Sequence, residues 1–194
     1  MIRLDYSIIA DIIKSGSRVL DLGCGNGELL ALLKKQKNCR GTGIEIDDRA
    51  VLNAMERGVS VAHGDLDRDL DVYEDKRFDY VILNESLQQV VNIEKALEDA
   101  LRIGSKVIVG IPNFCHIRGR FQIFFKGQVP VTPNLPYKWY NTPNLRFLSL
   151  KDFRCFCQEK GFMIEKACYM SAGKKVLWQS NLFADSGIFV LTKN

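Results

Sequence analysis

A run of apolar residues that ends in a glycine-rich turn constrains the fold of this chain more than any other feature. Residues 19–22, Val-Leu-Asp-Leu, are typical of a buried strand, and Gly23, Gly25 and Gly27 follow at alternate positions. Glycine lets the chain turn tightly and lets a ligand approach bare backbone, and helical periodicity begins at Glu28. This order predicts a Rossmann-like unit, whose helix N-terminus offers free N–H groups to an anionic ligand. Taken alone, the glycines also fit a tight turn without a ligand.

Strand-like and helix-like segments alternate along the first 111 residues. The strands are expected at 18–20, 41–45, 59–62, 78–83 and 106–111, and the helices at 4–13, 28–37, 49–57 and 93–102. This alternation predicts an α/β fold with a doubly wound, mostly parallel sheet and right-handed crossovers. A helix over 152–160 and two late strands, at 162–168 and 187–192, complete a predicted seven-stranded sheet.

Residues 112–148 differ in character from the rest of the chain. They hold all five prolines, at 112, 130, 133, 136 and 143, interleaved with aromatic and basic residues. So many aromatic side chains are not typical of a disordered linker, and we expect an ordered insertion. The predicted organisation is therefore one domain: a ligand-binding core over 1–111, a lid or partner-binding insertion over 112–148, and a C-terminal helix and strand pair over 149–194.

Composition excludes few classes of function but narrows the setting. The chain has 27 basic and 23 acidic residues, a net charge of +4, and the two signs are interspersed, as on a solvated surface. No apolar run is long enough to cross a bilayer and no leader pattern is visible, so a cytoplasmic protein is expected. Six cysteines fit neither a disulfide framework nor zinc spacing, and Cys155 and Cys157 would point to different faces of a helix. No metal site is predicted.

Acidic and amide residues follow the predicted strands at the edge where a ligand would bind. Glu45 lies 18 residues past Gly27 and ends the second strand, where a carboxylate can accept hydrogen bonds from both hydroxyls of a ribose. Asp65 and Leu66 follow the third strand and fit contacts to an adenine ring, although Asp65 is equally compatible with a simple turn. Asn84 follows the fourth strand and would line the same crevice.

Three features favour S-adenosylmethionine over a dinucleotide. The glycines are spaced Gly-x-Gly-x-Gly with Asp21 two residues before the first, an aspartate follows the third strand, and little chain remains for a separate substrate domain. The whole set resembles the class I adenosylmethionine-dependent methyltransferases. That resemblance implies that the backbone around Gly23 and Asn84 holds the methionine amino group, with Asp21 nearby. The expected ligand is S-adenosylmethionine or S-adenosylhomocysteine, and the expected contacts are Asp21, Gly23, Cys24, Gly25, Gly27, Glu45, Ile46, Asp65, Leu66 and Asn84.

Longer segments in the second half resemble the methionine biosynthesis protein MetW family. They are residues 112–120, 127–132 and 135–144, the last reading Leu-Pro-Tyr-Lys-Trp-Tyr-Asn-Thr-Pro-Asn, and residues 65–67 and 83–89 are similar too. The chain departs from the family pattern at Cys115, Ile117 and Asn141, where glycine, tryptophan and aspartate are expected. The resemblance implies a role in methionine formation beside homoserine O-acyltransferase as a partner.

Several insertion residues are candidates for contact with a substrate or partner. Guanidinium groups match carboxylates, so Arg118 and Arg120 fit an anionic ligand, and His116 fits a base; a packed loop histidine and solvated arginines are the alternatives. Tyr137, Trp139 and Tyr140 fit a pocket wall, an interface anchor or the core of a lid. His63, at the end of a strand expected to be buried, is interpreted as structural.

Three function classes follow from these features. The first is an adenosylmethionine-binding accessory protein that supports homoserine O-acyltransferase. The second is an active methyltransferase on a small anionic acceptor, for which no catalytic residue is assigned because methyl transfer from a sulfonium depends chiefly on positioning. The third, nucleic-acid modification, rests on Arg118, Arg120, Lys126 and nearby aromatic residues. It is disfavoured because Asn84 is followed by Glu85 and Ser86, not by the proline-proline-tyrosine of such enzymes.

Overall fold

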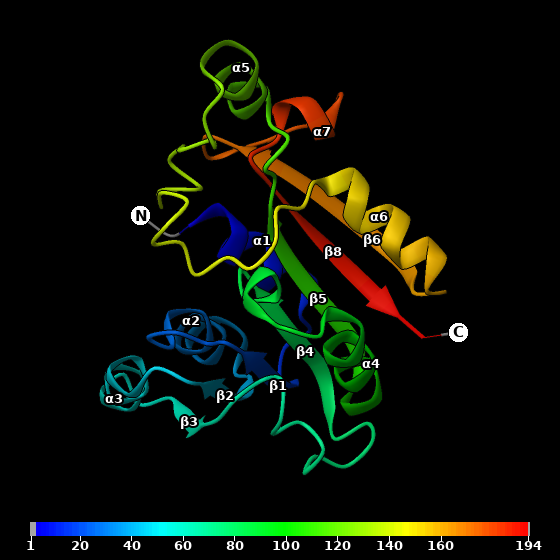
Figure 1. The fold of residues 1–194 in the computed structure, drawn as a ribbon. Coiled ribbons are helices and arrows are strands. Elements are labelled where there is room, and N and C mark those ends of the chain that lie inside the picture. Colours follow the sequence, from blue (N-terminus) through cyan, green and yellow to red (C-terminus); the bar gives the residue numbers. More distant parts are fainter. Residues whose placement is uncertain (1–2, 194) are drawn as a thin grey trace.

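A computed structural model describes residues 3–193 of the chain (Figure 1). Helices and strands alternate as the sequence predicts, and the 3-10 helix η1 and the helices α5 and α7 add to them. The elements are α1 (Leu4–Ile12), β1 (Arg18–Leu22), α2 (Glu28–Lys37), β2 (Arg40–Glu45), α3 (Asp48–Glu56), β3 (Ser60–His63), β4 (Phe78–Asn84), η1 (Leu87–Gln89), α4 (Ile93–Ile103), β5 (Gly104–Pro112), α5 (Ile117–Lys126), α6 (Leu150–Glu159), β6 (Met163–Ser171), β7 (Lys174–Lys175), α7 (Ser180–Phe183) and β8 (Ser186–Thr192).

All described strands belong to one sheet in the order β3-β2-β1-β4-β5-β8-β6-β7. The five strands from β3 to β5 pair in parallel, and β8, β6 and β7 join them in antiparallel register. The predicted doubly wound α/β sheet is thus confirmed, with the late strand pair at its end. The sheet has eight strands where seven were expected, because the two-residue β7 pairs with the end of β6.

Helices cover both faces of the sheet (Figure 1). One apolar cluster joins the strands to α1 and α2, with Ile9 and Leu33 fully buried. The other joins them to α4 and α6, with Leu97 and Phe153 in contact with the opposite face. Val19 of β1 belongs to the first cluster and Leu20 and Leu22 to the second, which is why central parallel strands read as continuous apolar runs.

Polar caps fix where the helices begin. Asn92 accepts a hydrogen bond from the Lys95 N–H at 3.1 Å at the start of α4. Ser149 and Asp152 form a reciprocal capping box at the start of α6, which satisfies two N–H groups of the first turn. These caps set where α4 and α6 begin.

One strand differs from its prediction. β3 lies at the edge of the sheet, and Ser60, Ala62 and His63 in it are exposed. The prediction that His63 ends a buried strand was therefore wrong, because an edge strand is covered less than a central one. Its Nε2 lies 2.9 Å from the Ile46 carbonyl oxygen and 3.4 Å from Asp48 Oδ1.

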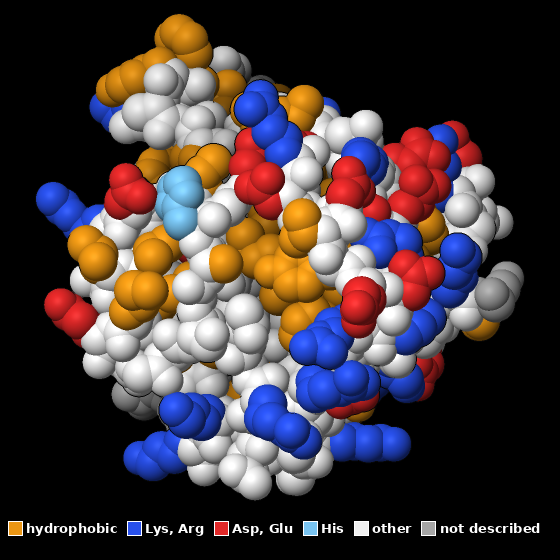
Figure 2. Space-filling model, turned by 90° about the horizontal axis from the view of Figure 1, so that it is seen from below, with side chains coloured by type: hydrophobic (Ala, Val, Ile, Leu, Met, Phe, Trp, Pro, Cys, Tyr) orange, Lys and Arg blue, Asp and Glu red, His pale blue; other side chains and the backbone are white. Residues whose placement is uncertain are grey.

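The insertion is ordered and contains a helix that the sequence reading did not predict. α5 follows β5 directly and lies beside α7 at one end of the sheet (Figure 1). Residues 127–149 return to α6 without a helix or strand. Seen from below, the surface carries acidic and basic side chains interspersed, with hydrophobic side chains gathered in patches (Figure 2). Among residues 3–193, no helix has the length and apolar character needed to cross a bilayer.

Candidate functional site

The glycine turn between β1 and α2 has the backbone that its spacing predicts. Gly23, Gly25 and Gly27 have φ values of 78°, 52° and 73°, a region that other residues rarely adopt. A Cβ placed on Gly23 would lie 2.7 Å from the Cβ of Ser86, so side chains from the β4 side close over it. A Cβ on Gly25 would meet no heavy atom within 4 Å. The backbone at Gly25 is therefore open to an approaching ligand.

The Glu45 carboxylate is fixed against this turn by backbone N–H groups. Its Oε2 accepts from Gly25 at 2.8 Å, and its Oε1 accepts from Ile46 at 2.9 Å and from Asp47 at 3.0 Å. Oε1 accepts two of these hydrogen bonds and Oε2 accepts one, so Oε2 retains capacity for a ligand hydroxyl. Glu45 is thus a preorganised acceptor at the end of β2.

A cavity of about 320 Å³ opens between these elements at the carboxyl ends of the parallel strands. Six of the ten predicted ligand contacts line it: Gly23, Gly25, Glu45, Ile46, Asp65 and Leu66. Sequence reasoning missed seven further lining residues: Ile44, Gly64, Asp67, Glu85, Ser86, Gln89 and Val90. Glu85 and Ser86 follow β4 directly, so the rule that selected Asn84 would have found them too.

The other four predicted contacts lie around the cavity without lining it. Cys24 packs its sulfur into the core against Gly43, and only its backbone belongs to the turn. Gly27 begins α2 and packs closely against Ala54. The Asn84 amide donates to Asp5 Oδ2 at 2.9 Å and so ties β4 to the start of α1.

Asp21, the fourth of these, is a buried carboxyl with an unusual environment. It is 3% exposed, and no described residue donates a hydrogen bond to its side chain. Burial, with a smaller contribution from the nearby Glu45 charge, raises the pKa of Asp21 to about 7. A cationic ligand group near this carboxyl would favour its charged form.

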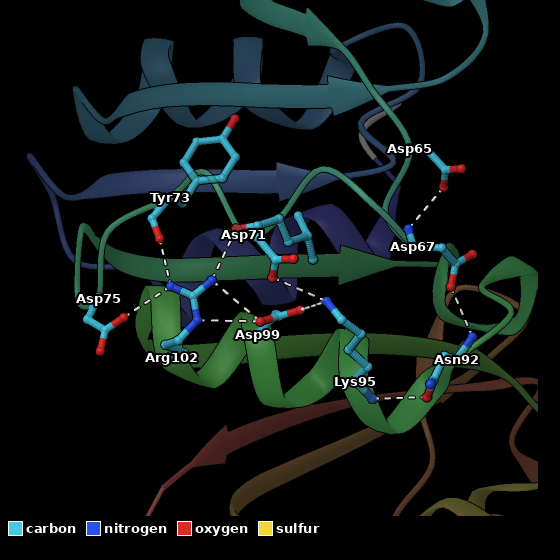
Figure 3. A network of polar contacts seen from close by, with 10 residues as sticks. Asp65, Asp67, Asp71, Tyr73, Asp75, Asn92, Lys95, Asp99 and Arg102 are labelled. Carbon is cyan, nitrogen blue, oxygen red and sulfur yellow. Dashed lines mark hydrogen bonds and ion pairs between the residues drawn. The ribbon is translucent and has the colours of Figure 1, made fainter.

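A network of polar contacts holds the segment between β3 and β4 onto α4 (Figure 3). Arg102 donates to the carbonyl oxygens of Leu70 and Tyr73 at 3.1 and 2.6 Å, and pairs with Asp75 at 3.0 Å. Asp67 accepts from the Asn92 N–H at 2.9 Å. The segment that contains Asp65 and Leu66 is therefore anchored at both ends, and the cavity wall it forms is fixed. No sequence pattern indicates this role of Arg102.

A second cavity of about 620 Å³ adjoins the first, and the two share Glu85 and Gln89 in their walls. Arg3 pairs there with Glu85 at 2.8 Å and with Asp5 at 2.7 Å. Gln88 also lines this cavity, and its Oε1 is buried without a hydrogen-bond partner among the described residues. The remaining walls come from the insertion and from the ends of β6 and β8.

The three polar candidates of the insertion differ in their surroundings. His116 is buried and caps α5, since its Nδ1 accepts from the Arg118 N–H at 3.2 Å, while its Nε2 lies 3.5 Å from Asp185 Oδ1. The Arg120 guanidinium donates to the Cys115 carbonyl at 2.6 Å. Arg118 lines the larger cavity, and its guanidinium makes no hydrogen bond or ion pair with a described residue. Of the three, Arg118 alone is placed to meet a ligand.

The three aromatic candidates lie within four consecutive positions of the insertion, and all are exposed. Tyr137 lines the larger cavity, and Trp139 and Tyr140 pack edge to face at 5.7 Å. Cys155 is exposed and Cys157 is buried, so the two point to different faces of α6. No group of three or more potential metal ligands occurs within the described part of the chain.

The chain matches one family model along nearly its whole length. The model described as "Methionine biosynthesis protein MetW" aligns with residues 3–191. This chain belongs to the MetW family. A relative from Rhodopirellula baltica, the bifunctional methionine biosynthesis protein MetXA/MetW, is 34% identical over 200 residues. The alignment covers 96% of this chain and 32% of that protein, so the chain spans about a third of its relative's length.

Solved structures share the fold of this MetW family member. A methyltransferase from Thermotoga maritima, described as a possible histamine N-methyltransferase, superposes with a TM-score of 0.69 at 21% identity and covers 98% of this chain and 88% of that one. The [4+2]-cyclase SpnF superposes with a TM-score of 0.69 at 18% identity and covers 97% and 80%. The fold is therefore that of the class I methyltransferases. Since one protein with this fold is a cyclase, the fold does not decide the reaction.

Proposed function

We propose that the protein binds S-adenosylmethionine or S-adenosylhomocysteine in the 320 Å³ cavity and supports homoserine O-acyltransferase as a partner in methionine biosynthesis. The fused relative carries this proposal, because its name joins a MetXA part to a MetW part in one chain. The implied setting is the cytoplasm. Linking two modules in one chain raises their effective concentration, which favours modules that already associate.

The residues around the cavity fit this ligand. Glu45 would accept from the ribose hydroxyls, and Asp65 with the Leu66 backbone would contact the adenine ring. The bare backbone at Gly25 leaves room along the turn, and Asp21, which accepts no hydrogen bond from a described residue, would offer its carboxyl to the methionine ammonium. The volume lies within the range of about 300–1,000 Å³ that is typical of small-molecule sites.

A co-expression experiment tests the partnership. The chain and the acyltransferase should co-purify, and the acyltransferase activity should differ between the complex and the enzyme alone. Adenosylmethionine is then added to complexes formed by the wild type and by Glu45→Ala. If the protein is a sensor and not a passive binder, the acyltransferase activity should change only in the wild-type complex. Absence of both co-purification and any change in activity would contradict the proposal.

A second candidate, an active methyltransferase on a small anionic acceptor, is favoured by the larger cavity. This cavity shares Glu85 and Gln89 with the proposed cofactor site, and Arg118 in its wall is a cation that pairs with no described residue. A bound sulfonium supplies a methyl group to an already nucleophilic acceptor, so Arg118 and the cavity walls would serve to position it. Formation of adenosylhomocysteine with a defined acceptor, reduced in Arg118→Gln, would establish this activity. No turnover with a panel of carboxylate metabolites would count against it.

A further inference from the structure

The helix α5 shows the reverse of the usual burial pattern. A surface helix of a globular protein normally turns its apolar side toward the core. In α5 the one buried residue is Gly119, whereas Phe121, Phe124 and Phe125 are 53%, 81% and 69% exposed. Three phenylalanine rings on one helix are thus left in contact with water.

The contacts of α5 explain how it is held in this orientation. A Cβ on Gly119 would lie 3.3 Å from Pro130 Cγ, so the helix approaches the Pro130 segment closely through its glycine. The Gln122 side chain exchanges two hydrogen bonds of 3.0 Å with the backbone of Val131. A small residue and an amide therefore face the protein, and the phenylalanine side is directed away from it.

The exposed rings form an ordered cluster. Phe121 stacks on Phe125 with centroids 5.4 Å apart, and Phe124 packs edge to face on Phe125 at 4.8 Å. The Arg120 guanidinium reaches the carbonyl of Asn181 in α7 at 3.4 Å, and on that side Trp178 stacks on Phe183 at 5.6 Å. Rings that are already in place lose little conformational freedom on binding, which favours a specific interface.

The charges of the region favour a protein of opposite charge over a second copy. Residues 112–151 contain six Lys or Arg and no Asp or Glu, and Lys126 at the end of α5 makes no ion pair with a described residue. Two copies meeting through α5 would place these cations against each other.

The cations on α5 itself are too few to suit a membrane or RNA. Both need several free cations, each worth about 1 kcal/mol near an anionic lipid surface. On α5, Arg118 lines the larger cavity and Arg120 is bound to a carbonyl, which leaves Lys126 alone. An apolar surface with few free cations is typical of a protein–protein interface.

We propose that the phenylalanine face of α5, formed by Phe121, Phe124 and Phe125, is the docking surface for homoserine O-acyltransferase. The inference rests on the proposed partnership and adds to it the surface through which it occurs. The surface that receives α5 is an apolar groove with an acidic rim that pairs with Lys126. Trp178 borders the contact on the α7 side.

Binding of the full-length chain to the purified acyltransferase, measured by calorimetry, tests this surface. The double variant Phe124→Ser, Phe125→Ser should weaken binding at least a hundredfold, because buried aromatic anchors dominate interface energies. A matched control is Leu52→Ser, Met55→Ser, which removes two exposed apolar side chains from α3 and should change binding less than twofold. Both variants should retain wild-type circular dichroism and adenosylmethionine binding.

The outcomes separate the surface from the partnership. Equal binding by wild type and the phenylalanine variant would overturn the docking surface and leave the partnership standing. No binding by the wild type would overturn both. A chain that is dimeric by light scattering and becomes monomeric in the phenylalanine variant would assign α5 to a second copy. Sedimentation with phosphatidylserine vesicles or binding to single-stranded RNA, lost in the same variant, would also overturn the proposal.

Discussion

The sheet edge that carries the proposed cofactor cavity and the phenylalanine face of α5 present opposite kinds of surface. At the edge, polar groups are fixed by backbone contacts, as Glu45 is by three N–H groups, and a cavity lies in front of them. On α5, apolar rings project into solvent and pack on one another. The first arrangement suits a small polar ligand, and the second suits a large apolar surface. Binding of the two kinds of partner should therefore be separable by mutation.

Among single substitutions, the largest effect on binding is expected at Glu45. Glu45→Ala should weaken adenosylmethionine binding about a hundredfold, because charge-assisted hydrogen bonding to the ribose, at about 1.5–3 kcal/mol per bond, is lost together with the contact that fixes Gly25. Calorimetry measures the change, and Asp48→Ala, which removes a nearby exposed carboxylate, is the control. Acyltransferase docking without cofactor should be unchanged. Unaltered cofactor affinity in Glu45→Ala would exclude the ribose assignment.

The free energy of unfolding should depend on pH through Asp21. Burial raises the pKa of Asp21 to about 7, against about 3.9 in an unfolded chain. The folded protein favours the protonated carboxyl of Asp21. The stability that this side chain contributes is therefore fully present below pH 4 and is lost as the pH rises through 7. Asp21→Asn should therefore be more stable than wild type by about 4 kcal/mol at pH 8 and nearly equal to it at pH 4. Urea unfolding at both pH values tests this, and a difference that does not depend on pH would contradict it.

The anchor of the cavity wall gives the next effect. Arg102→Met should lower the free energy of unfolding by about 1 to 2 kcal/mol, because the carbonyl groups of Leu70 and Tyr73 lose their donor. Adenosylmethionine affinity should fall less than in Glu45→Ala. Arg68→Met is the control, since Arg68 is exposed and its contact with Asp65 is 3.7 Å long. Equal unfolding midpoints for the two variants would show that the network is not needed.

The smallest effect on stability is expected from substitutions on the phenylalanine face. Phe124→Ser should change the free energy of unfolding by less than about 0.5 kcal/mol, as is usual for exposed positions. Thermal unfolding compared with Phe153→Ser, in the core, would show the contrast directly. A large loss of stability in Phe124→Ser would mean that the rings support the fold, and the distinction between the two regions would fail.

The same two regions show how far the sequence alone could lead. Glu45 and the glycine turn were predictable because parallel strands end at a common edge, so residues far apart in the chain meet there. Asp67 and Gln89 in the same wall were missed, because their positions depend on how the loops fold back. α5 was missed although Ile117, Phe121, Phe124 and Phe125 recur at helical spacing, and nothing in that spacing indicates that this side faces solvent. β7, Lys174–Lys175, carries no apolar signal at all.

Hydrogen bonds from the end of the insertion tie it to the wall of the 320 Å³ cavity. The Leu145 N–H donates to the Gln88 carbonyl at 3.0 Å, and Arg146 donates to the Val90 carbonyl at 2.7 Å, while Val90 lines the cofactor cavity. A ligand that shifts Val90 would thus also shift the insertion. Thermodynamic linkage then requires reciprocity. By whatever factor adenosylmethionine changes the affinity for the acyltransferase, the acyltransferase must change the affinity for adenosylmethionine by the same factor.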